Sequence, residues 1–330
     1  MIALPLDRFA ASFPYRPRLG RPTAITIGNF DGVHLGHASL LARCRAHAGN
    51  GGRVVALAFD PHPASTLRPG TEPPRLTAFE RRRELLLAVG ADEVERLEPT
   101  PALLAQEPEA FVRALLDRHG PTLIVEGDDF RFGKGRRGDI MMLRTLAAER
   151  GCAVEVVGPV EVGLGDHLMV RASSSVTRWL VAHGRVDDAR RVLGRPYELE
   201  GAVVRGDQLG RTLAIPTANL RTPCLLPADA VYAGVGVLPD GRRMPAAVSV
   251  GWRPTVGGRD RRAEVHLLDG RHPEHADWRP LPGLPEYGWC LRVELHRYLR
   301  DDLKFPSLDA MMEQIRRDVE RVRSVMAASG

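Results

Sequence analysis

The chain has 330 residues, 44% of them hydrophobic and 26% charged, which excludes disordered and fibrous proteins and allows two domains with separate cores. No apolar run approaches the roughly 20 residues of a membrane-spanning helix, and the first residues lack a secretion-signal pattern, so we expect a cytoplasmic protein without a membrane partner. The formal net charge of +5 is spread along the chain, so phosphate-bearing small molecules explain it as well as nucleic acid does.

Short β-rich runs alternate with helical patterns from residue 23 to about residue 157. TAITIGNF begins the series, a helix is expected near residues 36–48, and RVVALAF follows at residues 53–59. The alternation continues with PEAFVRALLDRHG before PTLIVEG, and with DIMMLRTLAAERG before CAVEVVG. Such alternation is typical of βαβ units and predicts a doubly wound, Rossmann-like α/β domain with a parallel sheet.

The pattern changes at about residue 195, after two short helical stretches. Runs of strand-forming residues then follow one another, separated by Gly, Pro and Asp turns, which predicts a small antiparallel β-barrel. SLDAMMEQIRRDVERVRSVM, near the end of the chain, has the apolar spacing of one helical face, with Ser307 as its expected N-cap. We place the domain boundary between residues 190 and 191, giving domains 1–190 and 191–330.

The four cysteines lie far apart in the sequence and form no C-x-x-C pair. This spacing indicates neither a disulfide framework nor a zinc site. We therefore expect reduced, structural thiols at Cys44, Cys152, Cys224 and Cys290.

The string GNFDGVHLGH, from Gly28 to His37, lies between the first predicted strand and the first predicted helix. Free backbone amides and the positive end of the helix dipole make such a junction an anion site. His34 and His37 are three residues apart, so at a helix start they can lie on one side and meet a triphosphate together. An isolated H-x-x-H is more often a pair of polar turn residues, and a zinc site would need further ligands. The whole string in its strand-to-helix context favours a nucleotide site.

This string resembles the H-x-G-H signature of the nucleotidylyltransferase superfamily, in the form typical of prokaryotic bifunctional riboflavin kinase/FAD synthetases. Similar segments follow in the family's order, namely FDPHP, GDDFRFGKGRRGD, SSSVTR and LGRPY. The resemblance implies that this half of the chain transfers AMP from ATP to FMN, forming FAD and releasing pyrophosphate. It implies that His34, His37 and Arg178 act on the phosphates as catalytic residues. The nucleotide-binding residues that it implies are Gly28, Asn29, Phe30, Asp31, Gly36, Asp129, Ser174 and Ser175.

The serine-rich motif and the segment around residues 129–134 are the less typical parts of this half. The serine-rich motif departs from the family pattern at Val176, where members usually carry arginine, and we expect adenylylation to survive because this position varies across the superfamily. Lys134 does not belong to a Walker loop, since neither Ser nor Thr follows it. The segment 129–132 would be a plain loop on its own; the resemblance implies that it helps to hold the nucleotide or the flavin.

GDQLGRTLAIPTANL, from Gly206 to Leu220, is the second informative string. Proline within a β-run marks an edge or a bulge, where a ligand can reach the backbone, and Thr and Asn beside it offer oxygens for a hydrated Mg²⁺. P-T-A-N alone is a commonplace turn sequence. Here it resembles the riboflavin kinase signature G-R-T-x-x-x-P-T-A-N, and SVGWRPTVGG, EVHLLD and LRVELHRYLRDDLKF extend the likeness.

The second resemblance implies that this half transfers the γ-phosphate of ATP to the ribityl 5′-hydroxyl of riboflavin. It assigns Thr217 and Asn219 to the Mg²⁺–phosphate site and Glu264 to the role of general base, since the attacking hydroxyl must lose a proton. The nucleotide-binding residues that it implies in the glycine-rich turn are Gly206, Gly210, Arg211 and Thr212. A Pro-rich stretch, residues 270–285, replaces the family's short acidic turn, and we expect it to be a surface loop.

Three other functions stay open from the sequence: a non-catalytic flavin- or nucleotide-binding regulator, a nucleic-acid-binding protein, and an enzyme with one working module. Both sets of phosphate-handling residues are present, which favours a bifunctional enzyme with ATP as co-substrate, Mg²⁺ as cofactor and riboflavin, FMN and FAD as substrates or products. We expect small-molecule partners and no nucleic acid. The oligomeric state, monomer or weak homo-oligomer, stays open.

Overall fold

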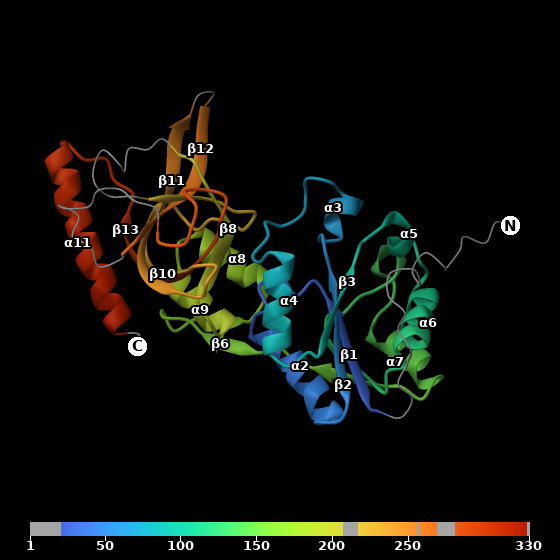
Figure 1. Ribbon diagram of the computed structural model, residues 1–330. Helices are drawn as coiled ribbons and strands as arrows, with labels where there is room; N and C mark the ends of the chain where they lie inside the picture. The colour runs from blue at the N-terminus through green and yellow to red at the C-terminus, as the bar shows by residue number, and fades with distance from the viewer. Residues whose placement is uncertain (1–20, 207–216, 256–257, 269–280, 329–330) are drawn as a thin grey trace. The chain divides into compact units, whose positions relative to one another are not determined.

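The computed structural model describes residues 21–206, 217–255, 258–268 and 281–328 (Figure 1). The described residues form two compact units. The first unit comprises residues 21–29, 39–71 and 86–158, and the second comprises residues 30–38, 72–85 and those from 159 onward.

A five-stranded parallel sheet is the centre of the first unit. Its strand order is β3-β2-β1-β4-β5, and β1 is buried along almost its whole length, as expected of a strand covered on both faces. The strands are β1 (Thr23–Gly28), β2 (Arg53–Phe59), β3 (Glu93–Leu97), β4 (Leu123–Gly127) and β5 (Ala153–Val157). The predicted parallel sheet is therefore confirmed.

Helices cover both faces of this sheet, with α2 (Leu35–Ala48) on one side and α6 (Pro108–His119) and α7 (Ile140–Ala148) on the other (Figure 1). Helix α6 begins with proline, whose missing N–H costs nothing at that position, and it ends at Gly120 in the left-handed conformation. Its apolar face packs with that of α7 against the sheet. Between residues 21 and 158 the structure also contains α3 (Ala64–Leu67), α5 (Pro101–Leu104) and the short 3-10 helix η1 (Lys134–Arg136). Helix α4 (Phe79–Ala88) lies mostly in the second unit.

The strand order reverses at β1, which has β2 on one side and β4 on the other. Ligands of doubly wound folds bind outside the carboxyl ends of the strands at such a switch point. In the β1–β4 ladder, Ala24 and Ile25 pair with Leu123 and Ile124. Beyond this ladder, the buried Glu126 side chain accepts a hydrogen bond from the Ile27 amide at 2.7 Å. Burial raises the pKa of Glu126 well above its usual value. A buried side-chain oxygen thus replaces the backbone acceptor where the two strands part.

The second unit contains a closed antiparallel barrel of order β10-β11-β12-β9-β8-β13, which leaves no strand edge unpaired. Large side chains such as Leu199, Tyr232 and Leu291 are completely buried in its core. The strands are β8 (Tyr197–Val204), β9 (Ala218–Arg221), β10 (Ala230–Val237), β11 (Arg243–Thr255), β12 (Gly258–Leu267) and β13 (Cys290–Asp301). The predicted antiparallel barrel is confirmed.

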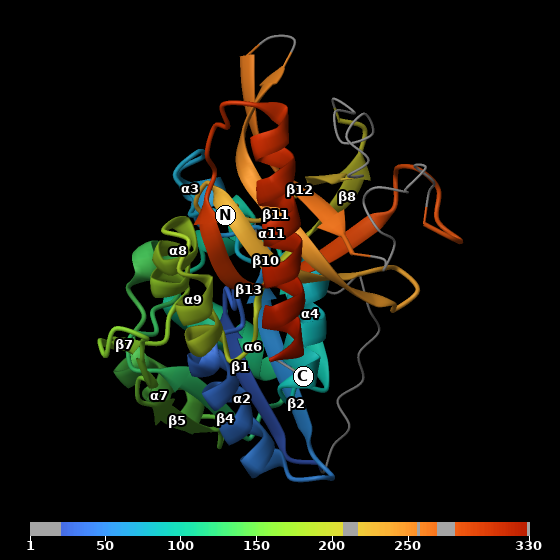
Figure 2. The ribbon, with the colours of Figure 1, turned by 90° about the vertical axis from the view of Figure 1, so that its left-hand side faces the viewer.

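The terminal helix α11 (Leu308–Ala327) lies along the outside of this barrel (Figure 2). Val322 packs with Val231 and Leu299 of the strands beneath it. The predicted N-cap is confirmed, because the Ser307 hydroxyl accepts a hydrogen bond from the Ala310 amide at 3.2 Å.

Two helices and a hairpin lie between residue 158 and the barrel in the second unit. The helices α8 (Ser174–Ala182) and α9 (Val186–Leu193) match the two predicted helical stretches. A two-stranded hairpin of β6 (Glu161–Gly163) and β7 (Met169–Arg171) was not predicted, because three-residue strands carry too little pattern. Across the described chain, every helix is too short or too polar to span a membrane. All four cysteines are free thiols.

Candidate active sites

A strained turn, Phe30–Val33, joins the end of β1 to α2. Its backbone is left-handed at Phe30 (φ 49°), Gly32 (φ 85°) and Val33 (φ 42°). A positive φ is unusual for phenylalanine and more so for a β-branched valine, and it costs on the order of 1–3 kcal/mol per residue. The side chains of Phe30 and Val33 are almost completely buried. The turn must therefore be held by packing and by polar contacts from the surrounding protein.

Asp31 supplies one set of these polar contacts. Its carboxylate is buried and accepts hydrogen bonds from the amides of Leu76 and Thr77, at 3.0–3.1 Å, and from Arg178 Nη2 at 2.6 Å. Its main-chain carbonyl accepts the hydroxyl of Ser174 at 2.7 Å. The bond to Arg178 joins two full charges and is of the stronger kind. Asp31 thus links the turn to the serine-rich motif by hydrogen bonds. Its carboxylate accepts hydrogen bonds from donors within the protein.

The two histidines of the H-x-G-H string stack on each other, with ring centroids 3.6 Å apart and planes 24° apart. Burial, followed by the charges of Arg195, Arg171 and Arg178, lowers the pKa of His34 to about 4. Burial, followed by His34 itself, also lowers the pKa of His37 well below its usual value. Both rings are therefore neutral at pH 7, and each offers one N–H donor and one lone pair.

Each ring has a polar atom that lacks a partner. The Nδ1 atoms of His34 and His37 are buried and make no hydrogen bond to any residue that the structure describes. Unpaired buried polar atoms are rare because they cost free energy, and sites that bind polar ligands are one place where they occur. No group of three or more His, Cys, Asp or Glu side chains gathers as metal ligands would in the described parts of the chain. The pair fits an anionic ligand such as phosphate.

Gly36 lies directly against the His34 ring. A Cβ atom at this position would lie 3.0 Å from Cε1 and Nδ1 of His34 and 3.1 Å from the carbonyl oxygen of Ala172. Both contacts are shorter than ordinary van der Waals contact, so a larger residue would displace the His34 ring. The glycine of H-x-G-H thus avoids close contacts with the His34 ring and the Ala172 carbonyl.

The serine-rich motif forms the start of α8. Ser173 is its N-cap and accepts a hydrogen bond from the Val176 amide at 3.2 Å, while Ser175 in the first turn is exposed. The first turn of a helix carries free amides and the positive dipole end, so it suits a phosphate. Val176, where the family usually has arginine, packs its side chain against the hydrophobic core. The side chain of Val176 is therefore a core contact in this chain.

Arg178 lies in the same cluster as the His pair. Its Nε donates to the Pro74 carbonyl at 2.7 Å and its Nη2 donates to Asp31. Within the described chain, Nη1 has no hydrogen-bond partner. Arg178 therefore supports the turn and still has donors for a ligand.

The remaining predicted residues of the N-terminal half belong to the first unit, except Phe30, which is a buried turn residue of the second. Gly28 ends β1, Asn29 follows it, and the exposed Asp129 follows the end of β4. These residues lie at the carboxyl ends of the two strands that flank the switch point of the sheet.

A row of polar residues crosses the outside of the barrel. Glu264 of β12 lies directly opposite Ser249 of β11 on one side and Asn219 of β9 on the other. Residues that lie opposite each other on antiparallel strands share a face of the sheet. Their sequence neighbours, such as Val265 and Leu220, belong to the core, so the row faces outward. Strand register thus brings together the predicted base and a predicted Mg²⁺ ligand, and adds Ser249, which was not predicted.

Asn219 carries the second unpartnered group. Its side chain is 9% exposed, and its Oδ1 is buried and lacks a hydrogen-bond partner in the part of the chain that the structure describes. Gly206 lies against it, because a Cβ there would be 2.1 Å from the Asn219 amide nitrogen. Thr217 is half-buried and directly precedes β9. Amide and hydroxyl oxygens are ligands that Mg²⁺ accepts, so these residues fit the predicted ion. Three predicted residues, Gly210, Arg211 and Thr212, lie outside the described residues.

Two family models match consecutive parts of the chain. Residues 17–167 match the family model for FAD synthetase, and residues 193–326 match the one for riboflavin kinase. The bifunctional riboflavin kinase/FMN adenylyltransferase of Pseudomonas fluorescens is 37% identical over 314 residues, which cover 94% of each chain. The chain belongs to this family.

Other known proteins are similar to this chain over a comparable length. The bifunctional riboflavin kinase/FMN adenylyltransferase of Escherichia coli K12 is 35% identical over 299 residues, covering 89% of this chain and 90% of that protein. A crystal structure from Streptococcus pneumoniae, described as a macrolide-efflux protein, matches with a TM-score of 0.77 and 26% identity, covering 92% of this chain and 94% of that one. The resemblance carried by the H-x-G-H and P-T-A-N strings is therefore confirmed, and the roles of individual residues stay predictions.

Proposed function

We propose that this member of the bifunctional riboflavin kinase/FMN adenylyltransferase family makes FAD in two ATP-dependent steps at two sites. Residues 191–330 would phosphorylate riboflavin, and residues 1–190 would adenylylate the resulting FMN. The observation that carries the proposal is that each motif gathers around unpartnered buried polar atoms, Nδ1 of His34 and His37 in one case and Oδ1 of Asn219 in the other.

For adenylylation, the FMN phosphate oxygen attacks the α-phosphorus of ATP. The bond from that phosphorus to the bridging oxygen breaks, and pyrophosphate leaves with the electron pair. His34 and His37 donate hydrogen bonds to phosphate oxygens on which charge accumulates, which lowers the barrier because the donors are already in position. Ser175, the start of α8 and Arg178 bind the β- and γ-phosphates. Asp129 helps to hold the nucleotide or the flavin.

For phosphorylation, Glu264 accepts the proton of the ribityl 5′-hydroxyl while that oxygen attacks the γ-phosphorus of ATP, and ADP leaves. A carboxylate suits this task because the hydroxyl becomes acidic only as the new bond forms. Thr217 and Asn219 would hold Mg²⁺, which when bound neutralises phosphate charge. Gly206, Gly210, Arg211 and Thr212 would bind the nucleotide.

The test is incubation of the purified chain with riboflavin, ATP and Mg²⁺, with flavins separated by chromatography over time. FMN should appear first and FAD after it, and supplied FMN should give FAD and pyrophosphate directly. Addition of EDTA should stop both reactions. Binding of flavin and ATP without any product would instead indicate a non-catalytic regulator, and FMN without FAD would indicate one working module. We also propose a cytoplasmic location; monomer and weak homo-oligomer both stay open.

A further inference from the structure

We propose that Arg195, a residue of the riboflavin kinase match, is a positioning residue for the adenylylation step, because it holds the strained turn that places His34 and His37. The proposal rests on the proposed function of the His pair. It assigns a role in adenylylation to a residue that lies within the riboflavin kinase match.

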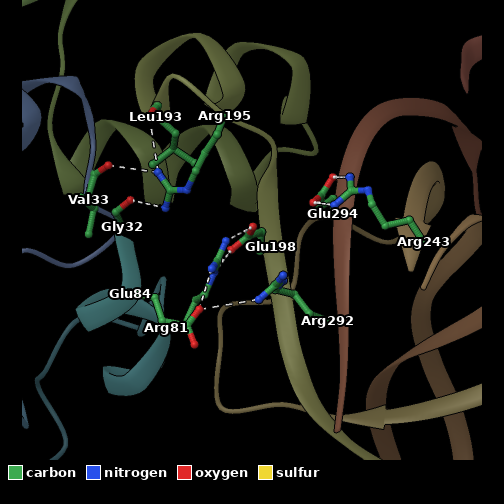
Figure 3. A network of polar contacts seen from close by, with 10 residues as sticks. All are labelled: Gly32, Val33, Arg81, Glu84, Leu193, Arg195, Glu198, Arg243, Arg292 and Glu294. Carbon is green, nitrogen blue, oxygen red and sulfur yellow. Dashed lines mark hydrogen bonds and ion pairs between the residues drawn. The ribbon is translucent and has the colours of Figure 1, made fainter. Parts of the chain in front are cut away.

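The geometry of the Arg195 guanidinium is specific for this turn (Figure 3). Nη2 donates to the carbonyl of Gly32 at 2.7 Å, and Nη1 donates to the carbonyl of Val33 at 3.0 Å. These carbonyls belong to two of the three left-handed residues, and His34 follows them directly. One planar fork on two consecutive carbonyls fixes the direction of both peptide groups. A backbone that would otherwise relax towards ordinary φ values is thereby held at the entry to the His pair.

Packing around Arg195 supports the same contact. A Cβ atom at Gly194 would lie 2.8 Å from Cδ2 of Leu35, and one at Gly32 would lie 3.5 Å from Cδ2 of Leu193. The segment Leu193–Arg195 therefore lies directly on the turn and on the first residue of α2. The glycine of the LGRPY string is what permits this approach.

The strand β8, which follows Arg195, is linked to α4 by an ion pair. Glu198 of β8 forms a two-pronged ion pair with Arg81 of α4, with both N–O distances at 2.8 Å, and Arg81 also bonds Glu84 at 2.7 Å (Figure 3). Burial, partly offset by Glu198, lowers the pKa of Arg195 to about 10, so the guanidinium keeps its charge at pH 7. A guanidinium that keeps its charge suits a positioning role.

Arg195 also contributes to the electrostatics of the pair. After burial, its charge is the largest influence that lowers the pKa of His34. A substitution that removes the charge should therefore raise the pKa of His34 from about 4 towards 6.5. Lysine at this position would keep the charge but could not form the paired hydrogen bonds of the guanidinium.

The test compares three full-length variants: Arg195→Ala, Arg195→Lys and the control Arg190→Ala, which removes an exposed arginine of the neighbouring helix α9. For each, kcat and KM are measured with supplied FMN and ATP, and riboflavin kinase activity is measured in the same preparation. An NMR titration of the His34 ring gives its pKa.

We expect Arg195→Ala to lower kcat for FAD formation about 10- to 100-fold, because small displacements of catalytic groups have effects of this size, with KM for ATP changed by less than about threefold. Kinase activity should stay within about twofold of the wild type, and the pKa of His34 should rise. Arg195→Lys should lose about fivefold in kcat without a rise in that pKa. The control should match the wild type.

A wild-type kcat for FAD formation in Arg195→Ala would overturn the proposal. So would an equal loss of both activities, because it would show general destabilisation. If Arg195→Ala does not fold, Arg195→Lys decides: a loss confined to FAD formation supports the proposal, and wild-type kcat overturns it. Failure of the wild-type chain to form FAD from FMN would instead refute the proposed function.

Discussion

The two candidate sites are built in opposite ways. The His site depends on a turn with left-handed Phe30 and Val33, held by Asp31 and Arg195 from two sides. The barrel site depends on the register of β11, β12 and β9, which puts Ser249, Glu264 and Asn219 in one row. A turn under strain needs polar supports from distant parts of the sequence, whereas a strand row needs only the ladder that builds the barrel.

This difference predicts where each site is vulnerable. The His site should be sensitive to residues that never touch substrate, since its geometry is held from outside. The barrel site should be sensitive mainly to its own polar residues. Four measurements test the comparison.

The largest effect is expected for His37→Ala. Loss of a preorganised donor at developing charge typically costs on the order of 100- to 1000-fold in kcat, so FAD formation from FMN should fall by this factor while riboflavin is still phosphorylated. Both products are followed by chromatography. His47→Ala, an exposed histidine of the same helix α2, is the matched control. Loss of FMN synthesis in His37→Ala would contradict two independent sites.

Asn219→Ala should show the converse pattern. Removal of a residue that holds the Mg²⁺–phosphate group should lower riboflavin phosphorylation by about 100-fold and leave conversion of supplied FMN to FAD unchanged. Arg221→Ala, which changes an exposed residue two positions along β9, controls for effects on the strand. An unchanged kinase rate in Asn219→Ala would refute the assignment of this site.

The buried His34 should make the stability of the folded chain depend on pH. Its pKa is about 4 in the folded chain and near 6.5 when unfolded, so between these values the unfolded state binds a proton that the folded state does not. The free energy of unfolding should therefore fall as the pH is lowered from 6.5 towards 4, with about 2 kcal/mol from His34 at pH 5. Melting temperatures of the wild type and His34→Gln, measured from pH 7.5 to pH 5, test this. Equal slopes for the two proteins would show that His34 does not contribute.

The smallest effect is expected for Ser307→Ala. The N-cap hydroxyl bonds the Ala310 amide, and its loss should cost about 1 kcal/mol of stability. The melting temperature should fall by a few degrees at most, with both activities retained, because α11 packs on the barrel face formed by residues such as Val231 and Leu299. A large loss of kinase activity would show that α11 affects the polar row.

The sequence predicted the elements well where the pattern was long. The alternation of strands and helices up to residue 157 and the strands after residue 195 produced the sheet and the barrel that the structure shows. The short hairpin of β6 and β7 was not predicted, because a three-residue strand is too short to show a hydrophobic period. Ser249 and Arg195 lie within quoted strings, SVGW and LGRPY, but nothing in those strings tells which side chain reaches a site.

What the sequence determined by itself is the chemistry and the fold class, because motif composition and hydrophobic period are local properties of the chain. What only the tertiary structure decided is which distant groups meet. The bonds of Asp31 to Arg178 and of Arg195 to Gly32 join positions 147 and 163 residues apart, and the facing of Glu264 and Asn219 follows from strand pairing. Such meetings depend on how the elements pack and on strand register, and no local pattern encodes them.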